Sequence, residues 1–265
     1  MRKIKIVLSV LWGCLAVYLG ARIYRSLFVT DDLHELRSDH FVVTYHGIYT
    51  NEASELLNHL EHHYDRIRKK LNDPAHEIIH VFIHPTQSDF STATGLRHSS
   101  VTGTSRGPNA FHVLWTTWFN SVLPDDPLKT AVHEFTHCVQ LNILIQQEQK
   151  QSTLQALADF DKVFEEKFSK EYPQWFWESI CDYEAGIVNC ISVKYGMRGN
   201  PTLKSLKDGN QIYNVGYTLI EYIVDRWGAD KLPLMITSYA DIEKVLQVSE
   251  SEFESGWIEF VNERY

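Results

Sequence analysis

A helix predicted from about Asp125 to 147 contains the segment His133-Glu-Phe-Thr-His137, and no other feature constrains the fold as strongly. The residues 124–127 supply start signals, because acids favour the positive end of a helix dipole and proline is tolerated in the first turn. At 100° per residue, His137 lies about 40° around the axis from His133 and one turn further along, so both imidazoles can reach one small cation. The apolar residues gather on the nearly opposite side: Leu128, Val132, Phe135, Val139 and Ile143. The helix therefore has a core face and a separate ligand face, which suits zinc.

A catalytic zinc ion needs a third protein ligand and an open coordination position. The segment 173–186 is predicted to be a helix opening at Pro173, and it carries Glu178 and Asp182 four residues apart on one face. Glu178 is the candidate third ligand. Asp182 can accept the outer N–H of a ligand histidine, which would fix the tautomer of that ring. A solvated helix face is the alternative for this acidic pair.

These residues also carry a resemblance to a known family. HEFTH, followed about forty residues later by a Pro-x-Trp-x-x-Glu-x-x-x-Asp-Tyr-x-x-Gly segment that begins at Pro173, resembles a gluzincin metallopeptidase of the peptidase MA-like group. The family's usual Glu-Gly-Xaa-Ala core is here Glu178-Ser-Ile-Cys181. The resemblance extends through 213–222, 226–231 and 253–257, and it covers most of the chain from about 40 to 265.

The resemblance implies a zincin-like α+β fold, with a small mixed β-sheet and the active-site helix in an N-terminal lobe and an all-helical C-terminal lobe. It also implies that His133, His137 and Glu178 bind Zn²⁺, that Glu134 is the general base, and that Asp182 supports a ligand histidine. Chemistry is consistent with the role of Glu134. This residue lies 100° around the helix from His133, where it can take a proton from water and pass it to the leaving amine.

Two further roles concern the substrate. A tetrahedral oxyanion needs a hydrogen-bond donor, and we favour Tyr213 over Tyr217 on the same helical face, although aromatic packing is the alternative for both. The predicted strand 110–115 can offer its edge to an extended peptide, because backbone pairing holds a substrate without demanding a particular sequence. His112 and Trp115 are then expected near the cleft.

The remaining patterns outline the fold. Strands are predicted at 40–46, 77–84 and 110–115, and a helix at 51–71 completes a strand–helix–strand unit. Further helices are predicted at 151–171, 173–186, 211–227, 230–239 and 249–263. We expect one domain over 39–265, with a sheet lobe at 39–147 and a helical lobe at 173–265. The residues 142–172 between the two ligand segments form either a lid or a plain helix hairpin.

The segment 1–25 has the layout of a signal peptide or a membrane anchor. Residues 6–21 carry no charge and are flanked by basic residues on both sides. The small residues that a signal peptidase requires are poorly placed, which favours a retained single-pass anchor over cleavage and secretion. The catalytic domain is then expected on the extracytoplasmic side of a membrane.

The net charge and the cysteine content exclude some classes of partner and of fold. The formal charge of −9, with basic residues scattered along the chain, argues against nucleic acid as a partner. Four cysteines without paired spacing exclude a disulfide scaffold, and the pairing of Cys138, Cys181 and Cys190 stays open.

The sequence thus predicts a membrane-anchored zinc metallopeptidase, a hydrolase that cleaves a peptide or protein substrate with zinc-activated water and Glu134 as base. The alternatives are a catalytically silent zincin-fold scaffold at the cell envelope and a hydrolase of non-peptide amides in the cell wall. The oligomeric state stays open.

Overall fold

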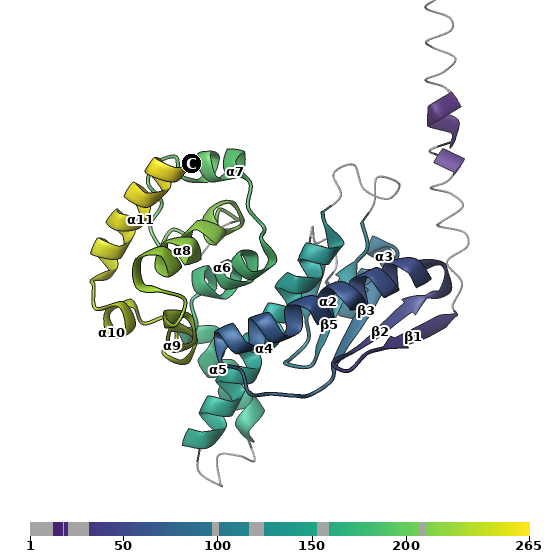
Figure 1. Cartoon of the computed structure of the whole chain (residues 1–265), viewed down its shortest axis with the longest axis horizontal. Coiled ribbons are helices and arrows are strands. Elements are labelled where there is room, and N and C mark those ends of the chain that lie inside the picture. The colour runs from purple at the N-terminus through teal and green to yellow at the C-terminus, as the bar shows by residue number, and fades with distance from the viewer. Residues whose placement is uncertain are drawn as a thin grey trace, which may run out of the picture.

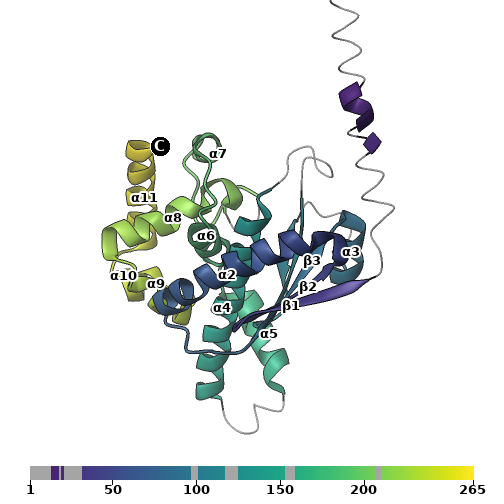
Figure 2. The same ribbon diagram turned by 45° about the vertical axis from the view of Figure 1, so that its right-hand side comes forward.

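The computed structural model of the chain describes residues 13–17, 19–20, 32–96, 101–116, 125–152, 159–206 and 210–265. Figures 1 and 2 show a β-sheet with its helices on one side of the molecule and a group of C-terminal helices on the other. One cluster of buried apolar side chains reaches from Phe41 in the sheet to Val261 near the C-terminus. The chain is a mixed α+β protein, as the sequence predicts.

The sheet has the strand order β1-β2-β3-β5-β4. Its central strands β2 (Phe41–His46), β3 (Ile79–His84) and β5 (Ala110–Leu114) run parallel and match the three predicted strands. The helix α2 (Thr50–Leu71) connects β2 to β3, which confirms the predicted strand–helix–strand unit. Two antiparallel edge strands were not predicted, β1 (Leu33–Arg37) and β4 (Gly103–Ser105).

The position of β5 corrects one prediction. This strand lies between β3 and β4, so it is not an edge strand that can pair with a peptide. The chain reverses at Gly107, whose φ of 76° is in the left-handed region, and the Arg106 N–H donates to the carbonyl of Ala110 at 2.7 Å. This turn folds Gly103–Ser105 back onto β5. Among the strands that the structure describes, β4 is therefore the outermost on this side of the sheet.

The long helix α4 (Pro127–Gln151) packs with α2 against one face of the sheet. Asp126 caps α4, because its carboxylate accepts from the N–H groups of Leu128 and Lys129, and Pro127 occupies the first turn. The apolar side chains of this helix meet alternate residues of the strands, which point to the same face of the sheet. The fully buried side chains in this region include Val81, Phe111, Phe135 and Val139. The opposite face carries α3 (Gln87–Thr94), which contacts β3 and β5.

The second half of the chain is helical in its described part. Two helices follow α4 closely, α5 (Phe160–Glu171) and α6 (Gln174–Ala185). Five more complete the fold: α7 (Cys190–Gly196), α8 (Ile212–Trp227), α9 (Lys231–Thr237), α10 (Ile242–Leu246) and α11 (Glu250–Arg264). The helices α6 and α8 pack closely at Gly216, where an added Cβ would lie 3.0 Å from Ser179 Oγ. The helix α6 also packs against α4, so it contacts both α8 and the helix that carries His133 (Figure 1).

The structure overturns the prediction of a single-pass N-terminal anchor with an extracytoplasmic domain. Within the described residues, no helix combines the length and the apolar character that crossing a bilayer requires. Of the segment 1–25, residues 13–17 and 19–20 are described, and they are helical. The rest of that segment lies outside the described residues.

Candidate metal centre

The centre of α4 carries two buried imidazoles and a buried carboxylate. His133 is 9% exposed, His137 4% and Glu134 5%. The two imidazole ring centroids lie 4.7 Å apart. The ring of Trp177 stacks on His137 with a centroid separation of 4.1 Å and restricts its rotation. The predicted ligand face of this helix is thus part of the protein interior.

The helix α6 brings Glu178 to both histidines. Its Oε2 atom lies 3.3 Å from Nε2 of His133 and 3.8 Å from Nε2 of His137. The structure therefore brings together the three side chains that the sequence suggests as ligands, although more than forty residues separate Glu178 from the two histidines. The Oε2 atom of Glu178 is thus a shared neighbour of the two Nε2 atoms, between α4 and α6.

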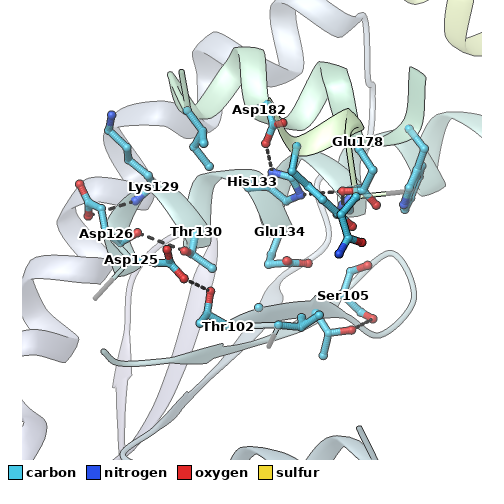
Figure 3. A pocket seen from close by; sticks show the side chains of 18 of the residues that line it. Thr102, Ser105, Asp125, Asp126, Lys129, Thr130, His133, Glu134, Glu178 and Asp182 are labelled. Carbon is cyan, nitrogen blue, oxygen red and sulfur yellow. Dashed lines mark hydrogen bonds and ion pairs between the residues drawn. The ribbon is translucent and has the colours of Figure 1, made fainter. Parts of the chain in front are cut away.

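The outer nitrogen of His133 contacts the second acidic residue of α6. Its Nδ1 atom lies 3.0 Å from Oδ1 of Asp182, which is itself buried. Burial alone would lower the pKa of His133, but the hydrogen bonds with Asp182 and Glu178 outweigh it and hold the pKa well above its ordinary value. Figure 3 shows His133 between these two carboxylates. The contact places Asp182 where a partner that orients a metal-binding imidazole belongs.

The outer nitrogen of His137 contacts a thiol that the sequence analysis left without a role. Cys181 Sγ lies 3.1 Å from His137 Nδ1, and the cysteine is free and buried. Ligand atoms of His133, His137 and Cys181 all lie within 4.8 Å of one another, so this buried group could hold a metal ion. One signal was present in the sequence: Glu178, Cys181 and Asp182 follow the i, i+3, i+4 spacing of a single helix face.

Glu134 lies beside the ligand residues with one free oxygen. Its Oε2 atom is buried and has no hydrogen-bond partner, while the backbone N–H of Ser105 is hydrogen-bonded to the same carboxylate. Burial, reinforced by the negative charge of Glu178, raises the pKa of Glu134 to about 7. A Cβ atom at Gly103 would lie 2.6 Å from Oε1 of Glu134, so the carboxylate fills the space that this glycine leaves open.

A pocket of about 750 Å³ opens onto these side chains. Four elements line it: β4, the first half of α4, α6 and the start of α8. Figure 3 shows Glu134 directed toward the space between α4 and the strand that carries Ser105. Among the described residues that line the pocket, none comes from α5.

Of the two candidate tyrosines, only Tyr213 is among the described residues that line the pocket. Tyr213 lines it and is 51% exposed, and partial burial, followed by the charges of Glu178 and Asp182, raises the pKa of its hydroxyl to about 12. Tyr217 is absent from the described lining, and its ring packs against Tyr183 with a centroid separation of 5.2 Å. Two amides that the sequence analysis missed, Asn210 and Asn214, also line the pocket.

His112 and Trp115 do not lie at the pocket, contrary to the expectation for them. Neither is among the described residues of the pocket lining. The Nδ1 atom of His112 lies 2.8 Å from Nε2 of His84, and its ring stacks on Phe82 across the sheet. Because side chains alternate along β5, His112 points to the face opposite α4.

The donor set fits a small divalent cation. Imidazole nitrogen and carboxylate oxygen are ligands that transition metals accept. The buried Oε2 atom of Glu134 has no hydrogen-bond partner, and a polar group bound beside it would supply one.

Comparison of the sequence with family models finds no match, and comparison with curated proteins finds none either.

Proposed function

We propose that this chain is a zinc-dependent peptidase with a zincin-like fold, in which His133, His137 and Glu178 hold the ion. The motif HEFTH and the contacts of Glu178 with both Nε2 atoms support this ligand set. A zinc ion bound by these residues would polarise the substrate carbonyl and lower the pKa of a water molecule to about 7. The open pocket beside them supports access for water and substrate.

The single observation that carries the proposal is the state of Glu134. A buried carboxylate oxygen without a partner is costly, so its retention points to a function. The carboxylate lies next to the proposed ligand His133 and is directed toward the pocket, where it can take a proton from a water molecule and return it (Figure 3). Glu134 would accept the proton of the attacking water and donate it to the leaving amine.

The walls of the pocket support a peptide as substrate. The strand β4 pairs with β5 on one side, and no other described strand covers its second edge. An extended peptide could add to this edge through backbone hydrogen bonds, which hold a chain without selecting its sequence. The hydroxyl of Tyr213 lines the pocket and would donate a hydrogen bond to the developing oxyanion.

The test combines metal content with turnover. The purified full chain should bind one equivalent of zinc and cleave members of a peptide library, whereas Glu134→Gln should keep the zinc and lose activity by about 10²-fold or more. Glu165→Gln, at an exposed position of α5, is the matched control and should behave as the wild type. Zinc binding without any cleavage that depends on Glu134 would contradict the proposal, and so would turnover confined to cell-wall amides.

A further inference from the structure

Cys181 makes more contacts in the site than any role assigned so far explains. Its side chain is fully buried, and its Sγ atom lies 3.1 Å from His137 Nδ1, 3.2 Å from Gln140 Nε2 and 3.4 Å from the carbonyl oxygen of Trp177. Three polar atoms therefore surround one sulfur atom. A cysteine that merely fills apolar space needs none of them.

The hydrogen-bond partners fix where each proton lies. Tyr172 donates to Oε1 of Gln140 at 2.9 Å, so the amide nitrogen of Gln140 faces Cys181 as a donor. The thiol has one proton of its own, and the carbonyl of Trp177 is its acceptor. The sulfur atom is then left to accept from Gln140 and from the N–H at Nδ1 of His137. His137 thus carries its proton on Nδ1 and presents the Nε2 lone pair to Glu178.

The same geometry separates Cys181 from the point where the ligand atoms meet. The two nitrogens of an imidazole lie on different edges of the ring, so a cation bound at Nε2 is remote from an atom hydrogen-bonded at Nδ1. His133 has its Nδ1 engaged by Asp182 and must also bind through Nε2. Glu178 contacts the Nε2 atoms of both rings, whereas Cys181 contacts Nδ1 of one.

We infer that Cys181 is a positioning residue for His137, held in turn by Gln140 and Tyr172, and that it is not a ligand of the metal. This inference rests on the proposed zinc site. The two ligand histidines then have different outer partners, a carboxylate for His133 and a thiol for His137. Removing an outer partner of this kind lowers metal affinity by about 10- to 100-fold.

The test uses variants of the full chain and two measurements that do not depend on turnover. Cys181→Ala should weaken zinc binding about tenfold in competition with a chromogenic chelator, while Cys181→Ser, which keeps an acceptor at this position, should stay close to the wild type. Cys138→Ala is the matched control, because Cys138 is a buried free cysteine of α4 whose Sγ contacts the carbonyl groups of Gly107 and Ala110 instead of the site. Circular dichroism checks that each variant is folded.

Cobalt substitution distinguishes a positioning residue from a ligand. A thiolate bound to Co²⁺ gives an intense charge-transfer absorption in the near ultraviolet, and we expect the wild type to lack it while showing visible absorption typical of a four-coordinate site. A charge-transfer band that disappears in Cys181→Ser would overturn the inference, as would zinc affinity unchanged in a folded Cys181→Ala. Either result leaves Glu134-dependent cleavage by the wild type intact, whereas a wild type that binds neither metal refutes the proposed function as well.

Discussion

Replacing Gly103 with alanine tests whether the position of Glu134 matters as the structure indicates. The new Cβ atom would lie 2.6 Å from Oε1 of Glu134, 2.7 Å from Cγ2 of Thr130 and 2.8 Å from Cγ of Glu134. Ordinary van der Waals contact begins near 3.4 Å, so the carboxylate must retreat by about 0.8 Å, the difference between these distances. Because Glu134 is packed inside the protein, it can move only by turning away from the pocket or by displacing β4.

A displacement of this size should cost catalysis far more than metal binding. A misplacement of about 1 Å can lower the rate of an enzyme about 10²-fold, which corresponds to about 2.7 kcal/mol of transition-state stabilisation. The three heavy atoms nearest to the added methyl group belong to Glu134 and Thr130, and none belongs to a proposed metal ligand. We therefore expect kcat to fall about 10²-fold in Gly103→Ala while zinc affinity and KM change little.

The assay is steady-state cleavage of the best peptide from the library, together with zinc titration of the same samples. Thr92→Ala is the control, because Thr92 is exposed on α3 and is not among the described residues that line the pocket. If Gly103→Ala hydrolyses the peptide at the wild-type rate, Glu134 is not held by this contact and the reasoning fails. A parallel loss of zinc would also count against it.

Three further predictions concern the partner of His133, a histidine of the sheet and the core. Asp182→Asn removes the charged partner of His133 and should weaken zinc binding about 10- to 100-fold, measured by chelator competition; unchanged affinity would exclude a supporting role for Asp182. Burial, followed by the charges of His84 and Arg106, lowers the pKa of His112 to about 4, so the unfolded chain binds the extra proton between pH 6.5 and about 4. The free energy of unfolding, from urea titrations, should therefore fall as the pH decreases through this window, and it should fall less in His112→Asn; equal slopes would refute this. Phe135→Ala should cost about 3–5 kcal/mol of stability, because the fully buried ring packs against Phe41 and Tyr64, and a loss below about 1 kcal/mol would show that the site collapses around the gap.

Features with a clear periodicity were predictable from the sequence. The separation of ligand and core faces on α4 follows from the 100° rotation per residue, and burial of His133 and Phe135 on different sides of the helix agrees with it. The meeting of Glu178 with both histidines needed more than periodicity, because two helices distant in sequence had to pack together. The expectation that these residues meet came from the resemblance to a family motif, not from periodicity.

Features that depend on tertiary contacts were not predictable. The strand β4 has three residues from a stretch rich in glycine, serine and threonine, and it forms only because the turn at Gly107 lays it against β5. The choice between Tyr213 and Tyr217 depends on how α8 packs on α6, which puts one ring at the pocket and the other against Tyr183. The contact of Cys181 with His137 required both helices in place.

The most direct test of the central claim is anomalous diffraction at the zinc absorption edge from crystals of the zinc-loaded full chain. The account predicts a single strong peak about 2.0–2.1 Å from Nε2 of His133 and of His137, with a carboxylate oxygen of Glu178 at a similar bonding distance. A zinc ion bound elsewhere, or one bound to the two histidines with Glu178 turned away from it, would contradict the account.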